Sequence, residues 1–243
     1  MSIIICYYLV ILTLDLKTNH LNTLTKYWFL EGFNLFNKLG RLKMMHMSKI
    51  LKMDQIEKGG TIRLKNKDDR SIFFLKKGTV KIVNVKTDTV KYIVKKGNIF
   101  GELAIYDQEA ADEEVACALE DCIVCYIECE RMEQIMQEYK SLKNGVIKIY
   151  GRRIQKLERR LQDLLYKDST TRITEFVFDY IKDFGEENEQ GTLIAKNLVS
   201  HKDIANLTNT SRQTVSNVLS QLRKEEKIYY NTREISMSVI DKK

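Results

Sequence analysis

One stretch of helical periodicity, residues 144–168, constrains the fold of this chain more than any other feature. Its apolar side chains alternate in steps of three and four, the a/d pattern of a two-stranded coiled coil: Ile147, Tyr150, Ile154, Leu157, Leu161 and Leu164. A stripe this narrow needs a second copy of itself, so we expect a parallel homodimer. The alternative is an amphipathic helix that lies alone on its own domain.

The charged residues beside the stripe agree with a parallel pair. If Ile147 is position a, Arg153 falls at g and Glu158 at the following e, the two positions that meet across such a seam. We expect the basic residues on these flanks to be mostly solvated: Arg152, Arg153, Arg159 and Arg160.

Length and composition place this helix between two ordinary domains. The 243 residues suffice for two domains, and 44% apolar with 30% charged residues excludes wholesale disorder. The five cysteines are an odd number in a chain without a convincing secretory signal. They argue against a disulfide framework and favour a reducing cytoplasm. The net charge of +7 suits an anionic partner.

The N-terminal run of apolar residues, 2–16, resembles a membrane element. As a helix it would span about 22 Å, short of the roughly 30 Å of hydrocarbon, and Asp15 lies within it. It also lacks the charged start and the cleavage site of a signal peptide. We therefore expect residues 1–24 to lie outside the folded unit, as an upstream choice of start codon would explain. A membrane tether is the alternative.

Three Lys-Gly dipeptides punctuate the next segment, with glycines at 59, 78 and 97. They lie among runs rich in β-branched and aromatic residues, such as TVKIVNV and VKYIV, which favour strands. Glycine supplies the positive φ that tight strand connections need. The pattern predicts a short antiparallel barrel or jelly roll, preceded by one or two short helices from Lys26. A Gly-Glu-Leu turn at 101–103 interrupts two further strand runs before a helix, ERMEQIMQEYKSL, leads to residue 144.

The stretch from Val199 to Lys224 carries the signals of two short helices joined by a sharp turn. Ser200 followed by Asp203 is a helix-start signal. Asn209 stands where the chain must turn, because asparagine tolerates left-handed backbone angles. A second helix would begin after a serine cap and bury one apolar face: Ser211, then Val215, Val218, Leu219 and Leu222.

These helices form a helix-turn-helix, since Ala205, Asn209 and Val215 have the spacing of its small residue, turn and buried aliphatic. The outer face of the second helix would read base edges through Arg212, Gln213, Ser216 and Asn217. Arginine can pair with guanine and glutamine with adenine. Polar residues near the two helix starts would contact DNA phosphates: Ser200, His201, Lys202, Ser211 and Thr214. Two packed helices with an incidental polar face are the alternative.

The neighbouring segments complete a winged domain. Residues 169–185 read as an amphipathic helix with Ser169 or Thr170 as N-cap and Gly185 as C-cap. From Ile228 the chain reads as a β-hairpin that turns near Asn231. Five cations against one acid between 196 and 224 make the predicted DNA face basic.

This combination resembles the CRP/FNR family of bacterial transcription regulators. The likeness covers about residues 26–243, and phrases such as IFGELA and DIANLTNTSRQTVSNVL look especially like members from Bacteroidetes-type bacteria. It implies an α+β fold: an N-terminal double-stranded β-helix (jelly-roll) domain like those that bind cyclic nucleotides over 25–143, a dimerisation helix over 144–168 and a winged helix-turn-helix domain over 169–243. It implies a cytoplasmic homodimer that binds a palindromic operator in double-stranded DNA and contacts RNA polymerase.

The resemblance also assigns individual residues. Arg212 matches the family's guanine-reading arginine, while Gln213 replaces a glutamate and Asn217 an arginine of the cyclic-AMP receptor, so we expect a shifted operator. The effector pocket would include Gly101, Glu102 and Leu103. In members that bind cyclic AMP, an Arg-Ser pair about nine residues later holds the phosphate. Here residues 111–114 read Ala-Asp-Glu-Glu. Carboxylates repel phosphate, so we expect no cyclic nucleotide and no cofactor.

The cysteines offer an alternative sensor. Cys117, Cys122 and Cys125 have the C-x4-C-x2-C spacing of plant-type iron–sulfur proteins, with Cys129 as a fourth candidate. However, CIVCYI reads as a strand, which would turn Cys122 and Cys125 to opposite faces. We therefore prefer buried thiols and no metal site. A redox or iron–sulfur regulator and a cyclic-nucleotide-responsive one remain the alternatives.

An enzyme is the rival of a different class. The chain has no phosphate-binding glycine loop, and its three histidines lie in unrelated segments: His20, His46 and His201. We therefore expect no catalytic residues. A regulator tethered to the membrane by residues 2–16 is a further alternative.

Overall fold

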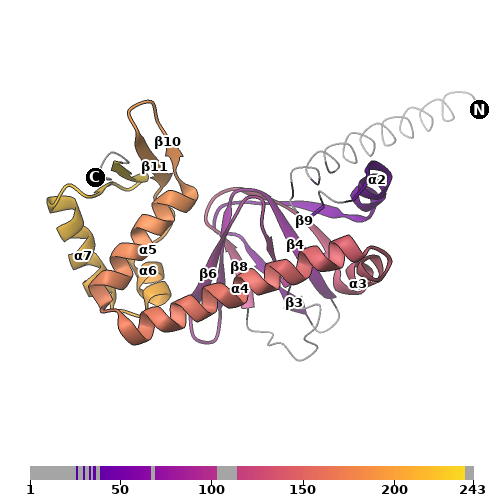
Figure 1. The fold of residues 1–243 in the computed structure, drawn as a ribbon, viewed down its shortest axis with the longest axis horizontal. Coiled ribbons are helices and arrows are strands. Elements are labelled where there is room, and N and C mark those ends of the chain that lie inside the picture. Colours follow the sequence, from indigo (N-terminus) through magenta and orange to yellow (C-terminus); the bar gives the residue numbers. More distant parts are fainter. Residues whose placement is uncertain are drawn as a thin grey trace, which may run out of the picture.

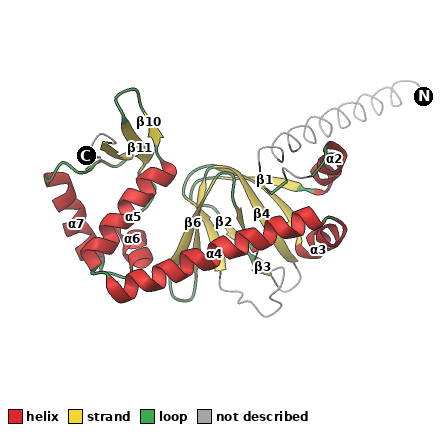
Figure 2. Ribbon diagram, in the orientation of Figure 1, coloured by secondary structure: helices red, strands yellow, loops and turns green. Residues whose placement is uncertain are grey.

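A computed structural model of the chain describes residues 39–66, 69–102 and 114–238, together with residues 26, 30, 33, 35 and 36. It contains an N-terminal β-roll and a C-terminal domain of helices and a small sheet (Figures 1 and 2). The long helix α4 (Lys140–Tyr166) runs along the β-roll and reaches the C-terminal domain (Figure 1). The α+β fold predicted from the sequence is confirmed.

The β-roll consists of two antiparallel sheets. One has the order β1-β9-β4-β3, with β7 paired to β4: β1 (Lys52–Ile56), β9 (Cys122–Glu128), β4 (Asp69–Lys77), β3 (Lys65–Asn66) and β7 (Ile99–Phe100). The other has the order β2-β8-β5-β6: β2 (Thr61–Arg63), β8 (Glu114–Ala118), β5 (Thr79–Asn84) and β6 (Thr89–Lys95). The predicted jelly-roll architecture follows from these two sheets.

Apolar side chains fill the roll and cover its outer face. Leu75, Val80, Ile82 and Phe100 are fully buried within the roll. A second core forms outside the first sheet, where Phe74 packs with residues of the flanking helices. These helices are α2 (Arg41–Ile50), α3 (Cys129–Glu138) and the first turns of α4.

The Lys-Gly dipeptides mark strand connections, as the sequence predicts. Gly59, Gly78 and Gly97 all have φ between +85° and +90°. Gly78 is the most constrained, since a Cβ there would lie 2.5 Å from the Sγ of Cys122 and 2.8 Å from the carbonyl oxygen of Asp121. Glycine is required at this turn by both its backbone angles and the space around it.

The cysteine-rich strand turns its thiols in different directions. Cys122 belongs to the core inside the roll and Cys125 to the core outside it, so the prediction of opposite faces is confirmed. Burial raises the pKa of Cys125 to about 11 and also raises that of Cys122, which disfavours the thiolate forms that ligate metals. Within the described residues, no three His, Cys, Asp or Glu side chains gather as a metal site would need.

The helix that the seam predicts is longer than expected. It begins at Lys140 rather than residue 144, directly after the non-helical Tyr139 that ends α3. Ile154, Leu157 and Leu161 are 56%, 58% and 59% exposed, and Ile147 is also exposed. Tyr150 is half-buried, since it also packs against the core outside the first sheet. Its place in a dimer interface stays a prediction.

The C-terminal domain combines three helices with a four-stranded sheet. The helices are α5 (Ser169–Phe184), α6 (His201–Thr208) and α7 (Arg212–Lys224). The sheet has the order β10-β11-β13-β12: β10 (Glu186–Glu187), β11 (Thr192–Lys196), β13 (Glu234–Ser238) and β12 (Tyr229–Tyr230). The predicted hairpin is β12–β13, and the Asn231 side chain accepts from the backbone N–H groups of Arg233 and Glu234 at its turn.

The two ends of α5 test the capping predictions. Gly185 is the C-cap as predicted. The N-cap is Asp168, not Ser169 or Thr170, and its carboxylate accepts from the Thr171 backbone N–H at 2.7 Å. Aspartate serves as well as serine or threonine in this role and stands one residue earlier.

No helix among the described residues is long and apolar enough to cross a membrane. The apolar run 2–16, on which the membrane alternative depends, lies outside the described residues.

Candidate DNA-binding surface and sensor site

The first helix of the motif, α6, starts with a reciprocal capping box. The Ser200 hydroxyl accepts from the Asp203 backbone N–H at 3.1 Å, and the Asp203 carboxylate accepts from the Ser200 N–H at 3.1 Å. These two bonds satisfy donors that a helix start leaves free. The helix-start signal in the sequence is confirmed.

The turn between α6 and α7 has the predicted left-handed residue. Asn209 has φ 51° and ψ 58°, and Ser211 then caps α7 by accepting from the Thr214 backbone N–H at 3.0 Å. The inner face of α7 is buried against α5 and α6: Val215, Val218, Leu219 and Leu222. This packing fixes which face of α7 is available to DNA.

The four predicted base-reading residues share the outer face of α7. Arg212, Gln213 and Asn217 are exposed, while Ser216 is half-buried. The Gln213 amide donates to the Asn217 side-chain oxygen at 3.0 Å. The two residues expected to differ from the cyclic-AMP receptor are therefore hydrogen-bonded to each other. Their role in reading bases stays a prediction.

The five predicted phosphate contacts differ in their surroundings. Ser200 and Ser211 serve as caps, and the Thr214 hydroxyl lies 2.8 Å from that of Ser211. Burial, with a smaller effect of Arg212, lowers the pKa of His201, so this side chain is neutral at pH 7. Lys202 is the cation of the set, and in this structure it forms an ion pair with Asp88 of the β-roll.

The C-terminal domain contacts the β5–β6 hairpin and the β8–β9 turn of the β-roll through several such pairs. Lys81 of β5 forms a 2.7 Å ion pair with Asp203, whose side chain is only 7% exposed. The Asn206 amide donates to the Asp88 carbonyl at 3.3 Å. Lys196 and Glu120 form a further ion pair at 2.5 Å. The face that the sequence predicts for phosphate is thus partly engaged with the β-roll.

The Gly-Glu turn at the end of β7 places a carboxylate in a buried position. Gly101 has φ +75°, and a Cβ there would lie 2.9 Å from the Ser71 carbonyl oxygen. The side chain of Glu102 is 2% exposed and forms an ion pair with Arg153 of α4. Its second oxygen, Oε2, has no hydrogen-bond partner among the described residues.

Two further residues of the same site come from β6 and α4. The Arg153 guanidinium lies 4.0 Å from the centre of the Tyr92 ring, and the Tyr150 hydroxyl donates to the Glu102 carbonyl. Burial lowers the pKa of Arg153, but Glu102 and Tyr92 outweigh it and hold this pKa above the ordinary value. The group is therefore a permanent cation facing Glu102.

Arg153 corrects two predictions made from the heptad pattern. It was expected to be solvated and to pair with Glu158 of a second chain, yet it is 21% exposed and bound to Glu102 of its own β-roll. Arg160, also expected to be solvated, is half-buried and donates to the Lys91 and Asn206 carbonyls. The heptad register describes only the face of α4 that carries the seam. Arg153 and Arg160 instead bind groups of the β-roll and of α6.

The rest of the predicted effector region is described only in part. Leu103 and residues 111–113 lie outside the described residues. Glu114, the last of the acidic run, is paired with Lys91 of β6. Its charge is therefore partly compensated by the β-roll itself.

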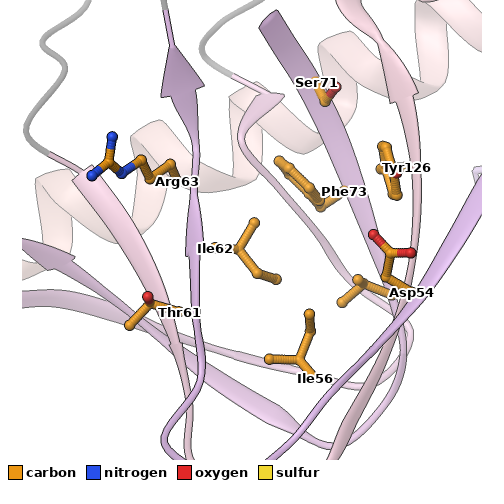
Figure 3. Close-up of a pocket in the computed structure, with 9 residues that line it drawn as sticks. Asp54, Ile56, Thr61, Ile62, Arg63, Ser71, Phe73 and Tyr126 are labelled. Carbon is orange, nitrogen blue, oxygen red and sulfur yellow. The ribbon is translucent and has the colours of Figure 1, made fainter.

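A cavity of about 290 Å³ opens between the two sheets of the roll (Figure 3). Ile56, Ile62 and Phe73 form its apolar part, and Asp54 and Arg63 lie at opposite sides (Figure 3). The Gly101 turn adjoins it, since a Cβ at Gly101 would meet Ser71 and Phe73, which both line the cavity.

The sequence indicates Glu102 through its motif, but not Tyr92 and Arg153 as its neighbours. It also does not indicate Asp88 as the partner of Lys202. Tyr92 belongs to an ordinary strand pattern, and Asp88 to an ordinary turn. The only sequence signal for Arg153 is its place among the arginines beside the apolar seam, a pattern that equally fits solvated flanks.

Comparisons with known proteins match both halves of the chain. The model of the cyclic nucleotide-binding domain matches residues 53–139, and that of the Crp-like helix-turn-helix domain matches residues 171–242. The Global nitrogen regulator of Synechococcus elongatus is 25% identical over 207 residues, which cover 84% of this chain and 90% of that protein. The cAMP-activated global transcriptional regulator Vfr of Pseudomonas aeruginosa is 23% identical over 161 residues, 64% of this chain and 74% of Vfr.

Solved structures agree on the fold. A CooA mutant from Carboxydothermus hydrogenoformans has a TM-score of 0.61 and 23% identity, over 77% of this chain and 83% of CooA. FixK2 from Bradyrhizobium japonicum has a TM-score of 0.64 and 16% identity, over 77% of this chain and 92% of FixK2.

Proposed function

Because the chain belongs to the CRP/FNR family of transcription regulators, which are not enzymes, we propose that it binds a palindromic operator as a parallel homodimer. The observation that carries this proposal is the row of exposed aliphatic residues along α4. Large exposed apolar stripes mark interaction sites. A second copy offers the same stripe, so two α4 helices related by a two-fold axis would bury both stripes against each other.

In such a dimer the two α7 helices would enter successive major grooves about 34 Å apart. Arg212 would pair with a guanine, and Gln213 and Asn217 would read neighbouring bases. Because Gln213 and Asn217 already contact each other, we expect them to act as one unit at adjacent positions. RNA polymerase is the further partner that family membership suggests, and the cytoplasm is the compartment that fits both partners.

The test of the dimer uses charge introduced into the seam. Leu157→Glu with Leu161→Glu would place four carboxylates in a two-chain seam, so we expect monomers in sedimentation equilibrium and loss of palindrome binding. Leu42→Glu is the matched control, because Leu42 is 84% exposed on α2 and is not part of the α4 seam. A dimer that survives the double substitution would overturn the proposal.

We further propose that the signal received by the β-roll is not cyclic AMP. Supporting this, residues 111–114 contain no cation for a cyclic phosphate, and Glu102 is already bound by Arg153. No cofactor is expected. The relative Vfr is cAMP-activated by name, so the point is testable. Operator binding by the purified dimer should be the same without and with cyclic AMP; binding that appears only with the nucleotide would refute it.

A further inference from the structure

We propose that Arg160 and Arg172 are positioning residues that together fix the direction of the recognition helix α7 relative to the dimer helix α4. Both guanidinium groups hold backbone carbonyls at the C-terminal end of α6, one from α4 and one from α5. This proposal rests on the proposed function, since it concerns how a dimer presents two recognition helices to two half-sites.

Arg172 joins the end of α4 to the turn of the motif. Its Nη1 donates to the carbonyl of Lys167, the C-cap of α4, at 2.6 Å. Its Nε donates to the Thr208 carbonyl at 3.0 Å and its Nη2 to the Asn209 carbonyl at 3.2 Å. A helix end leaves such carbonyls unpaired and partly negative, so a cation suits them. The planar guanidinium fixes the angle between these groups as well as their distance.

Arg160 links α6, the first helix of the motif, to the β-roll. It lies on α4, and its Nη1 donates to the Lys91 carbonyl of β6 at 3.1 Å. Its Nη2 donates to the Asn206 carbonyl of α6, also at 3.1 Å. Both acceptors are neutral carbonyls, and burial lowers the pKa of this arginine. A half-buried cation gains little charge compensation from neutral carbonyls, so these contacts should add little net stability. We infer that their main effect is to fix the geometry of the two helices.

Three of the carbonyls that these arginines bind lie within four residues of one another at the end of α6, at 206, 208 and 209. Asn209 is left-handed, and α7 begins three residues later at Arg212. A rotation at the end of α6 would therefore be passed directly to α7. In a dimer it would change the separation of the two recognition helices, which must match the spacing of successive grooves.

The experiment measures preference for half-site spacing. The full chain and its variants Arg160→Ala, Arg172→Ala and Arg172→Lys are titrated with duplexes whose half-sites are separated in steps of one base pair. A single half-site duplex is included. Arg159→Ala is the matched control, since it removes an exposed arginine from the neighbouring position of α4. Thermal unfolding of every variant is recorded in parallel.

We expect the native chain and Arg159→Ala to prefer one spacing. In both alanine variants that preference should fall by about tenfold, the order expected when charge-assisted hydrogen bonds are lost. Affinity for the single half-site should change little. Arg172→Lys should resemble Arg172→Ala, because an ammonium group keeps the charge but not the planar fork.

The contrary results are distinct. An unchanged spacing preference, with weaker binding to the single half-site or a lower Tm, would show that the arginines only stabilise the domain and would overturn the proposal. Equal loss on all duplexes, including random ones, would indicate phosphate contacts and would also overturn it. A native chain that binds paired and single half-sites equally well would instead refute the dimer on which the proposal rests.

Discussion

The chemistry of single side chains decides how this chain would read DNA and hold its domains. Arg212 is exposed at the first turn of α7, where side chains reach base edges in the helix-turn-helix geometry. Glu102 and Arg153 form a pair between the β-roll and α4, with Tyr92 stacked on the cation. Arg212 would contact DNA, whereas Glu102 and Arg153 contact each other. Substitution of Arg212 should therefore change DNA affinity, and substitution of Arg153 should change the free energy of unfolding.

Arg212→Ala should weaken binding to the selected operator by roughly 1 to 3 kcal/mol, the worth of a bidentate arginine–guanine contact. Binding to random DNA should hardly change, because base contacts carry sequence information and phosphate contacts do not. Competition titrations at one fixed salt concentration measure both affinities. Equal loss on both DNAs would mean that Arg212 contacts only phosphate.

Arg153→Ala should destabilise the chain by about 3 kcal/mol, since removing one partner leaves a buried carboxylate unpaired. Arg152→Ala removes an exposed arginine from the preceding position of α4 and should have little effect. Urea unfolding at pH 7 measures both. If the two variants unfolded alike, the Glu102–Arg153 pair would contribute nothing, and Arg153 would be free for the seam role that the heptad register suggested.

At the scale of elements, local signals explain most of what the sequence predicts. The seam of α4, the capping box and left-handed turn of the motif, and the Lys-Gly strand connections all depend on residues close together in sequence. The structure differs where a residue just outside the pattern competes, as when Asp168 caps α5 ahead of Ser169 and Thr170. The structure also differs from the prediction where a side chain binds an element distant in sequence, as Arg153 does. Glu102 and Arg153 lie 51 residues apart, and no periodicity links them.

The cap at the start of α5 gives a prediction about pH. The hydrogen bonds from Thr171 hold the pKa of Asp168 below its ordinary value of 3.8. Its ionised form therefore stabilises the folded chain above about pH 4, and this contribution is lost as the pH falls through the folded pKa. Asp168→Asn keeps an acceptor but removes the charge, so its Tm should lie below that of the native chain at pH 7.

The two Tm values should converge as the pH falls below the folded pKa of Asp168. Thermal scans monitored by circular dichroism at several pH values measure this difference. Asp54→Asn, in β1, is a control outside α5. A gap between Asp168→Asn and the native chain that stayed constant down to the lowest pH would show that the charge at this cap is unimportant.

At the scale of the whole molecule, charged side chains of the β-roll form ion pairs with the helix α4 and with the C-terminal domain. The ion pair of Lys202 with Asp88 joins residues 114 positions apart and occupies the cation expected to bind a DNA phosphate. The sequence could identify each module, but not this arrangement, because a lysine on a basic face and an aspartate in a turn look ordinary separately. We therefore predict that DNA and the β-roll compete for Lys202.

This competition can be measured by a double-mutant cycle. Asp88→Asn should free Lys202 and tighten binding to operator and random DNA alike, because phosphate contacts carry no sequence information. In a Lys202→Ala background, Asp88→Asn should have no further effect. Lys202→Ala alone should reduce the dependence of log affinity on log salt by about one unit, as expected for one lost phosphate contact. His201→Ala should leave that slope unchanged at pH 7, since burial keeps His201 neutral.

The same cycle separates the pairwise contact from general electrostatics. Removing any carboxylate from the surface favours DNA slightly, and Asp54→Asn reports this background, since Asp54 lies in β1 of the roll. Low pH should mimic Asp88→Asn only near the folded pKa of Asp88, which Lys202 lowers from its ordinary value, so the pair persists through neutral pH. Tighter binding by Asp88→Asn that survived in the Lys202→Ala background would show that Asp88 repels DNA directly rather than withholding Lys202 from it.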